Sequence, residues 1–324
     1  MLPSLSIVIP THQRQDLLRA CLQSIESHAA PKTDILVVDD ASPADATPRV
    51  VADFPGVRCI RLPRRSGFAV AANTGLREAR GEIVEFLNDD TEVTAGWAEA
   101  ALAGFENERV AAVAPLVLFH PATQPLHLRH RLRLDSAGDR YYRGGVAAKR
   151  GHGQVLSDEH CKSCQVFGAS ASSAFYRRKV LQEMGGFPES FGAYFEDVDV
   201  AFRLHWAGWQ TFYQPASRVY HHVSSSYGKK SRRLLEVQSR NEERVFWRNI
   251  PRHSLSRALP FHAVVLAAKA WRRWTDGELL PFLLGRLHLL TELGELRRHR
   301  RLLHAMHPKA DWDGWQIEAK YWRE

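Results

Sequence analysis

The chain has 324 residues, enough for one large domain with an appendage or for two small domains. Its 44% hydrophobic and 25% charged residues are typical of a globular protein, and its four cysteines are too few for a disulfide scaffold, which favours a reducing compartment. The net charge of +8 arises in the C-terminal third, since residues 226–324 hold 20 Lys and Arg against 11 Asp and Glu.

Cellular location is predicted from the same sequence. No run of about 18 apolar residues occurs, so we expect no membrane-spanning helix. Residues 1–10 lack a basic n-region and lead directly into an apolar run, so we expect no signal peptide and a cytoplasmic location. The basic C-terminal third has two interpretations: a solvated helical surface, or a face that meets an anionic membrane or nucleic acid.

Strand and helix patterns alternate over roughly the first third of the chain. Apolar runs predict four strands, at residues 5–9, 35–38, 57–62 and 83–87. Helical spacing predicts helices over residues 17–25 and 68–79. This alternation is typical of an α/β fold with a parallel sheet and right-handed crossovers.

Polar clusters follow three of these strands: Thr11-His12, Asp39-Asp40 and Asn88-Asp89-Asp90. Because ligands of parallel sheets bind at the carboxyl ends of the strands, we expect the clusters to line one edge. The adjacent carboxylates Asp89 and Asp90 repel each other unless a positive charge lies nearby, and Mg²⁺ or Mn²⁺ with substrate phosphates supplies it. The alternative is that Asp90 or Thr91 caps the helix that holds Trp97.

The pattern is less regular over residues 120–165 and resumes afterwards. We predict a strand over residues 166–176, a helix over 198–206, and short strands at 211–213 and 218–220. After about residue 230 the chain is predicted to be helical, with Trp and Leu on apolar faces and Arg and Lys between them.

Three further groups carry chemistry. Glu196-Asp197-Val-Asp199 opens the predicted helix, where acidic residues favour the helix dipole or serve as a general base. Tyr220-His221-His222 ends the last strand, and its histidines are structural hydrogen bonders or bind metal or phosphate. His160-Cys161-x-x-Cys164 resembles half a zinc site, or two small residues of a strand.

Several motifs in fixed order resemble those of the inverting family-two glycosyltransferases of GT-A fold, and the pattern is most similar to the bacterial rhamnosyltransferase-like group. The resemblance covers roughly residues 4–250. The motifs are Ser6-Ile-Val-Ile-Pro-Thr11, Val37-Val-Asp-Asp-Ala-Ser42, Gly67-Phe-Ala with Asn73-x-Gly75, Ala79-Arg-Gly-Glu82, Leu87-Asn-Asp-Asp-Thr-Glu92, Asp135-Ser-Ala-Gly138, Phe167-Gly-Ala169, Gly185-Gly-Phe187, Glu196-Asp-Val-Asp199 with Arg203 and Gly208, and Val219-Tyr-His221.

The resemblance implies a role for each site residue. Asp197 matches the catalytic base, and Asp90 and His221 match ligands of a divalent cation, Mg²⁺ or Mn²⁺. Gly168, Glu196 and Arg203 match residues that support the site or the acceptor. The residues implied to bind the nucleotide sugar are Thr11, Asp40, Asn73, Asn88, Asp89 and Asp90, with Asp40 on the pyrimidine and Asn88 where many relatives carry Asp.

The implied activity is inverting transfer of a sugar from a nucleotide-diphosphate donor to a glycan or lipid-linked acceptor in cell-surface polysaccharide synthesis. Likeness to the rhamnosyltransferase-like group suggests rhamnose, on a dTDP- or UDP-linked donor. The expected organisation is a GT-A catalytic domain over residues 1–228, followed by a basic helical region over 229–324. Within the domain, residues 1–115 are the nucleotide-binding half and 116–228 the acceptor-binding half.

Other expectations concern the loop and the partners. The segment 224–230 is a candidate lid over the diphosphate. The C-terminal helices are candidates for peripheral membrane contact at the inner face of the cell membrane, for packing on the catalytic domain, or for a homodimer. No nucleic acid is expected as a partner.

Two other functions fit parts of the sequence. A sugar-phosphate nucleotidyltransferase also uses a Rossmann-like half with acidic metal ligands, but usually has a Gly-rich loop after the first strand, where this chain has Pro10-Thr-His-Gln-Arg14. A non-enzymatic basic adaptor for membrane or nucleic acid would leave the acidic clusters as structural elements.

Overall fold

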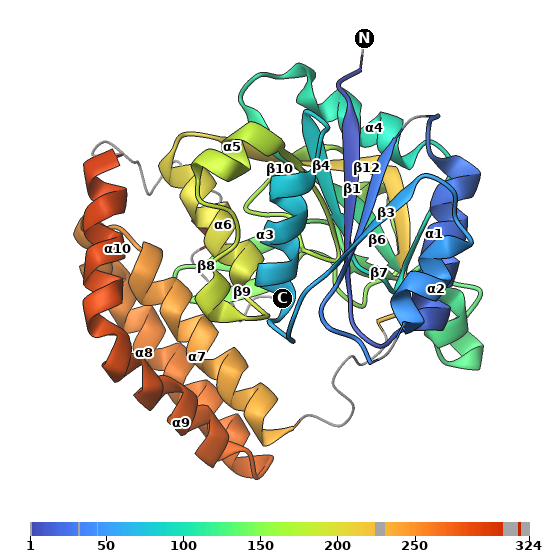
Figure 1. Cartoon of the computed structure of the whole chain (residues 1–324). Coiled ribbons are helices and arrows are strands. Elements are labelled where there is room, and N and C mark those ends of the chain that lie inside the picture. The colour runs from blue at the N-terminus through green and yellow to red at the C-terminus, as the bar shows by residue number, and fades with distance from the viewer. Residues whose placement is uncertain (1, 32, 44, 224–230, 307–316, 319–324) are drawn as a thin grey trace.

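The computed structural model describes residues 2–31, 33–43, 45–223, 231–306 and 317–318. A central sheet with helices on both faces forms most of the molecule, and the helices α7–α10 lie together beside α6 (Figure 1). The predicted α/β architecture with a C-terminal helical extension is therefore confirmed.

The first half of the sheet is parallel, as predicted. Its strands run in the order β3-β2-β1-β4, and every neighbouring pair is parallel. The elements of this half are β1 (Leu5–Thr11), α1 (Gln15–His28), β2 (Asp34–Asp39), α2 (Ala46–Ala52), β3 (Val57–Arg61), α3 (Phe68–Glu78) and β4 (Ile83–Leu87).

The second half of the sheet is mixed, with order β10-β12-β6-β11 next to β4. Its strands are β5 (Thr91–Val93), β6 (Val110–Phe119), β7 (Leu134–Ser136), β10 (Cys164–Val166), β11 (Ser173–Arg177) and β12 (Gln210–His221). Two predictions change here. The strand predicted over 166–176 is two strands separated by an irregular stretch, and the two predicted at 211–213 and 218–220 are one long strand with a register shift between Gln214 and Arg218.

Alternation along the strands produces two apolar cores. On β1, Val8 packs into one core with α3, α5 (Arg178–Glu183) and α6 (Glu196–Trp206). Its neighbours Ile7 and Ile9 pack into the other with α1, α2 and α4 (Trp97–Ala103). Gly75 lets α3 lie close to β1, because a Cβ there would come within 2.2 Å of Val8 Cγ1.

A small second sheet includes part of residues 120–165, where the sequence pattern was less regular. It contains β8 (Asp139–Tyr142), β9 (Val146–Lys149) and β13 (Ile317–Glu318) in the order β13-β8-β9. Short 3₁₀ helices occupy Gly104–Glu106, Pro121–Thr123, Leu126–Leu128, Asp158–Cys161, Glu189–Phe191 and Leu289–Glu292.

The helical extension consists of α7 (Arg232–Asn249), α8 (Arg252–Thr275), α9 (Leu279–His288) and α10 (Leu293–Met306). Val245 and Phe246 of α7 share a buried cluster with Phe202 and Trp206 of α6, so the extension packs on the sheet domain through the helix that begins at Glu196. No described helix is both long and apolar enough to span a membrane.

Candidate active site

One cavity of about 670 Å³ lies at the carboxyl ends of the central strands. Its lining brings together most of the residues that the sequence singled out, from segments far apart in the chain. They are Thr11, Asp40, Asn88, Asp89, Asp90, Glu196, Asp197 and His221.

The strand ends meet as predicted. Thr11 Oγ1 donates to Asp89 Oδ2 over 2.7 Å, and the backbone NH of Asp40 donates to the carbonyl of Thr11 over 2.9 Å. Arg14 Nη1 lies 3.1 Å from Asp89 Oδ1 and 2.9 Å from Asp90 Oδ2. Burial raises the pKa of Asp89 to about 6, although Arg14 and Thr11 act in the opposite direction. Sequence reasoning missed Arg14, whose only signal was a basic residue just after the first strand.

The helix-cap alternative for this cluster is excluded by the structure. The helix that holds Trp97 has Gly96 at its N-cap, so neither Asp90 nor Thr91 caps it. Instead the carbonyl of Asn88 accepts hydrogen bonds from the Thr91 hydroxyl at 2.5 Å and from the Thr91 NH at 3.2 Å. The turn leaves Asp89 and Asp90 buried at the edge of the cavity.

Asp90 meets His221 at the end of β12. Asp90 Oδ1 and His221 Nε2 are 3.1 Å apart, and both side chains are buried. His221 Nδ1 lies 2.9 Å from Asp135 Oδ2, and because a carboxylate only accepts, Nδ1 carries a proton. Nε2 faces the Asp90 carboxylate in the same way and donates to it, and binding of a cation at Nε2 would release that proton. A carboxylate behind a histidine in this way is the usual second shell of a metal-binding imidazole.

Asp135 is itself held by charge. Lys149 Nζ lies 2.8 Å from Asp135 Oδ2, and His152 Nδ1 lies 3.3 Å from Oδ1. Burial acts to raise the pKa of Asp135, but the hydrogen bonds from His152 and His221 and the charge of Lys149 outweigh it and lower this pKa well below its usual value. The carboxylate stays ionised behind His221. The sequence marked Asp135 only as the first residue of the Asp135-Ser-Ala-Gly138 motif.

Asp40 lies on another part of the wall. Its two carboxylate oxygens accept backbone NH groups from Ser66 at 2.6 Å and Gly67 at 2.8 Å. Gly67 has a φ of 89°, which favours glycine. These bonds fix the loop before α3, and with it the edge of the cavity next to Phe68.

Asp197 faces the cavity from the start of α6. Its carboxylate accepts the NH groups of Ala171 at 3.0 Å and Val198 at 2.8 Å. Burial raises the pKa of Asp197 above its ordinary value, and these two NH groups partly oppose that rise. Tyr194 and Phe195, just before it, have φ of 71° and 68°, a strained conformation for non-glycine residues that clusters at functional sites.

Two further carboxyl groups surround Asp197. Glu196 is buried with Oε2 unpartnered, and burial followed by the charge of Asp197 raises its pKa well above the usual value. Asp139 of β8 lines the same cavity, and burial together with the Asp197 charge raises its pKa as well. Sequence reasoning missed Asp139, which lies in a stretch without a clear secondary-structure pattern.

Three predicted residues lie outside the cavity wall. Asn73 donates to the Phe187 carbonyl over 2.8 Å and accepts the Phe187 NH over 2.8 Å. Arg203 binds Asp199 at 2.8 Å and the carbonyls of Met184 and Gly186. Gly168 lies where a Cβ would come within 2.9 Å of Ala201 Cβ, so it allows close packing on α6. All three hold the elements that carry the site.

The backbone NH of His222 donates to the Asp90 carbonyl over 2.9 Å, while the His222 side chain faces Glu92 and His120. His222 Nε2 is 2.7 Å from Glu92 Oε1, and its ring stacks on that of His120 with centroids 3.9 Å apart. Glu92, His120 and His222 are close enough together to offer one ligand atom each to a metal ion. The candidate lid at 224–230 lies outside the described residues.

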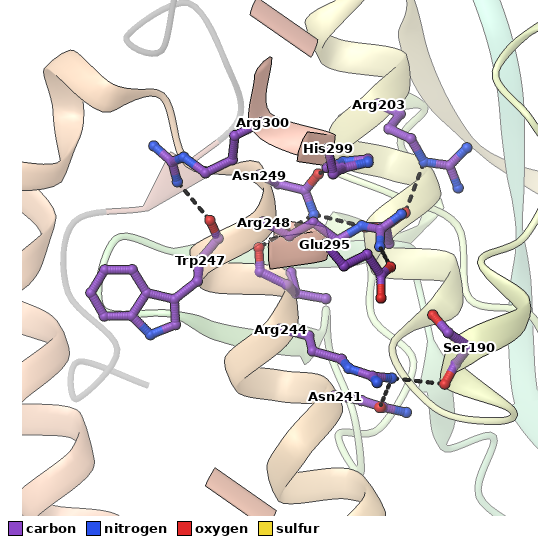
Figure 2. A network of polar contacts seen from close by, with 12 residues as sticks. Ser190, Arg203, Asn241, Arg244, Trp247, Arg248, Asn249, Glu295, His299 and Arg300 are labelled. Atoms are coloured by element: carbon purple, nitrogen blue, oxygen red, sulfur yellow. Dashed lines mark hydrogen bonds and ion pairs between the residues drawn. The ribbon is translucent and has the colours of Figure 1, made fainter. Parts of the chain in front are cut away.

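The helix α7 holds the loop in front of Asp197. Asn241 Nδ2 donates to the carbonyls of Phe191, Ala193 and Tyr194 over 2.9–3.0 Å. Arg244 Nη1 donates to the Ser190 carbonyl over 2.7 Å, and Figure 2 shows Asn241 and Arg244 directed from α7 toward this loop. Since Ala193, Tyr194 and Phe195 line the cavity, the helical extension fixes part of the cavity wall.

The fold and site define the class of protein: an α/β protein with acidic groups at the carboxyl ends of its strands. Comparison of the chain with known proteins identifies the family. The chain belongs to glycosyl transferase family 2, whose family model matches residues 6–185. The family that the motifs predicted is therefore confirmed.

Relatives agree with this family. The chain is 29% identical to the uncharacterized protein y4gI of Sinorhizobium fredii over 74% of this chain and 27% of the relative. It is 26% identical to the O-antigen biosynthesis protein RfbC of Myxococcus xanthus over 69% of this chain and 18% of the relative. It is also 26% identical to the N-acetylglucosaminyl-diphospho-decaprenol L-rhamnosyltransferase of Mycobacterium tuberculosis, over 69% of this chain and 78% of the relative. The chain thus spans about a quarter and about a fifth of the first two relatives.

Solved structures share the fold. GalNAc-T7, solved with UDP, GalNAc and Mn²⁺, matches 81% of this chain and 54% of its own, with a TM-score of 0.60 and 16% identity. The mannosyltransferase PcManGT of Pyrobaculum calidifontis, solved with GDP-Man and Mn²⁺, matches 97% of this chain and 88% of its own, with a TM-score of 0.54 and 20% identity. The chain therefore has the predicted GT-A fold.

Proposed function

We propose that this chain transfers a sugar from a nucleotide-diphosphate donor to an acceptor hydroxyl with inversion at the anomeric carbon, and that Asp197 is the general base. The observation that carries this proposal is the presence of two separate groups in one cavity. Asp90 and His221 lie at the strand ends, and Asp197 lies at the start of α6. A donor diphosphate at the first and an acceptor hydroxyl at the second would place the anomeric carbon between them.

A divalent cation fits between Asp90 and His221. Their facing atoms are 3.1 Å apart, close to the ~3 Å between neighbouring ligands of an octahedral cation with bonds of about 2.1 Å. Asp135 orients His221 for ligation through Nε2. The solved structures with Mn²⁺ support the same cofactor class, and we propose Mg²⁺ or Mn²⁺. A bound cation would neutralise the charge that develops on the departing diphosphate.

The chain's own groups perform the proton chemistry. Asp197 accepts the proton as the acceptor O–H bond breaks, the oxygen forms a bond to the anomeric carbon, and the bond to the diphosphate oxygen breaks with its electron pair. A single displacement from the opposite face inverts the anomeric configuration. The raised pKa of Asp197 suits this role, because a base is most effective when its pKa approaches the working pH.

The donor and acceptor are proposed from the remaining site residues and the relatives. Thr11, Asp40, Asn73, Asn88 and Asp89 are assigned to the donor side, directly or through the loops they hold. A rhamnosyltransferase and an O-antigen protein among the relatives support rhamnose on dTDP or UDP as donor and a glycan or lipid-linked acceptor in cell-surface polysaccharide synthesis. Gly168, Glu196 and Arg203 are assigned supporting roles around the acceptor.

The proposed organisation follows the predicted boundaries. Residues 1–115 form the nucleotide-binding half, 116–228 the acceptor-binding half, and 229–324 the helical region. We propose a cytoplasmic protein, peripheral on the inner face of the cell membrane.

A donor screen tests the activity. The chain is incubated with a panel of nucleotide sugars and Mn²⁺, and thermal stabilisation and release of nucleoside diphosphate are measured. We expect one donor to stabilise the fold and to be consumed, and NMR of the product should show an inverted anomeric centre. Stabilisation by a nucleoside triphosphate with a sugar phosphate, accompanied by pyrophosphate release, would instead establish a nucleotidyltransferase.

A further inference from the structure

Exposed apolar side chains gather on one part of the molecule. Among the described residues, seventeen large hydrophobic side chains are exposed, and twelve of them lie between Leu259 and Met306. These twelve belong to the helical segment from α8 to α10. Because large exposed apolar surface marks contacts with other molecules or membranes, this segment is a candidate for such a contact.

On α9 the exposed residues form a stripe. Leu280, Leu283, Leu284 and Leu287 are all exposed, and their spacing places them on one side of the helix. The opposite side packs on α7, where Gly285 allows close approach because a Cβ would come within 2.3 Å of the Glu236 carbonyl oxygen. The leucine stripe is therefore the outward side of a helix that is already fully packed on its inward side.

On α8 the exposed side carries aromatic residues. Trp271 and Trp274 are 64% and 59% exposed, and their ring centroids are 5.0 Å apart. Val264 is also exposed, about two turns before Trp271. The buried side of the helix contacts the sheet domain through His262, whose Nδ1 lies 2.8 Å from the Gly144 carbonyl oxygen. Trp prefers the interface between water and lipid, because its ring is apolar and its N–H is polar.

The net charge around these residues is positive, because residues 252–306 hold ten Lys and Arg against four Asp and Glu, one of which, Asp276, lies 3.9 Å from Arg272. Neither α8 nor α9 contains an Asp or Glu, whereas α8 carries the exposed Arg257 and Arg272. On α10, Arg297, Arg298 and Arg301 are also exposed. Arginine can extend its charged end to lipid headgroups while its stem covers apolar surface. An apolar face with basic neighbours is the composition of helices that lie in the plane of a membrane surface.

We propose that the outward side of α8 and α9, with Trp271, Trp274 and the leucine stripe, binds the surface of an anionic lipid bilayer. Charge favours this occupant over a second copy of the chain, because a dimer through this face would bring two strongly basic regions together. An anionic membrane instead attracts each exposed arginine by electrostatics and accepts the apolar side chains at the same time.

The surface would hold the catalytic cavity near lipid-linked acceptors, and this consequence rests on the proposed transferase function. Membrane binding itself does not, and it is measured without donor or acceptor. If the chain transfers sugar but does not bind vesicles, only the proposed membrane-binding surface is overturned. If it binds vesicles but transfers no sugar, only the proposed transferase function is overturned.

The test is vesicle co-sedimentation of the full chain. Vesicles of phosphatidylcholine with phosphatidylglycerol should sediment the protein, vesicles of phosphatidylcholine alone should sediment much less, and added salt should weaken the binding. Tryptophan emission should shift to shorter wavelength with the anionic vesicles. Equal sedimentation with both vesicle types, or none with either, would overturn the proposal.

Variants locate the surface. W271A/W274A and L280S/L287S should each bind the anionic vesicles roughly tenfold more weakly, because the apolar part of the contact is lost. L126S, at an exposed leucine of the sheet domain, is the matched control and should bind as wild type. Unchanged binding by the first two variants overturns the proposal, as does a wild-type dimer that L280S/L287S converts to a monomer.

Discussion

Arg248 of α7 forms an ion pair with Asp199 of α6, with 2.9 Å between Arg248 Nε and Asp199 Oδ1. Asp199 is fully buried, and Arg203 and Asn249 also bind its carboxylate, at 2.8 Å and 2.9 Å. Burial acts to raise the pKa of Asp199, but Arg248 and Arg203 outweigh it and lower this pKa. The carboxylate is two residues after Asp197, so the helical extension fixes the helix that carries the proposed base.

The hydrogen bonds from Asn241 to the loop before Asp197 should control catalysis as well as stability. N241A removes the donor to three carbonyls of the loop before Asp197, and we expect a loss of about 1–3 kcal/mol in the free energy of unfolding. Because this loop lines the cavity, kcat should fall more than tenfold at a temperature where the variant is folded.

The control for this change is S239A on the same helix. Ser239 Oγ donates to the Phe282 carbonyl over 2.7 Å, a buried bond between α7 and α9 that does not involve the cavity. S239A should lower the melting temperature and leave kcat unchanged. If both variants keep normal kcat, α7 supports the fold alone.

Asp135 should set the affinity for the cation. D135N keeps the size of the side chain but removes the charge behind His221, and losses of a metal's second shell typically cost about 10- to 100-fold in affinity. We expect Mn²⁺ binding, measured by calorimetry, to weaken by this factor. S136A, which alters only a bond to the Gly138 carbonyl, should bind Mn²⁺ normally, and equal affinities in all three proteins would contradict the role of Asp135.

Transfer should lose activity on the acid side at a higher pH than an ordinary aspartate would impose. Burial raises the pKa of Asp197 above 3.8, and a general base acts only when deprotonated. kcat/KM should therefore fall about tenfold per pH unit below that raised pKa. The charge of Lys149 lowers the pKa of Asp197, so K149M should move the acid limb to higher pH, while K179M at an exposed lysine should not. An acid limb at the ordinary pKa of aspartate would exclude Asp197 as the base.

Stability should depend on pH through Glu85, which lies in the core between Trp97 and Ser173. Burial raises the pKa of Glu85 from 4.5 to about 8, so the folded state binds a proton that the unfolded state releases. The contribution of Glu85 to the free energy of unfolding should be fully present below pH 4.5 and fall by at most about 1.4 kcal/mol per pH unit up to about pH 8. E85Q should flatten this slope in chemical denaturation, and E78Q, at an exposed glutamate, should retain it.

The sequence predicted the first half of the fold well, because its signals are local. Buried parallel strands appear as continuous apolar runs, and the predicted strand at residues 83–87 coincides with β4. The meeting of Thr11, Asp40 and Asp89 followed from the rule that parallel strands end at one edge.

The remaining site depends on contacts between distant residues. His221 was predicted next to Asp90 only through family resemblance, and its partner Asp135 is 86 residues away in the chain. Arg14, Asp139 and Lys149 carry no motif that identifies their position in the cavity. The bonds of Asn241 to a loop 47–50 residues earlier could not be predicted, because helical periodicity shows that α7 has a buried side but not what lies against it.

The most direct test of the account compares wild type with D197N in donor turnover. With the donor identified by the screen, Mn²⁺ and an acceptor present, transfer and donor affinity are measured for both proteins. D197N should lose about 10²- to 10⁴-fold in transfer, the range of general base catalysis, while its donor dissociation constant stays within about threefold of wild type. Normal transfer by a D197N protein that binds donor normally would contradict the assignment of Asp197 as the base.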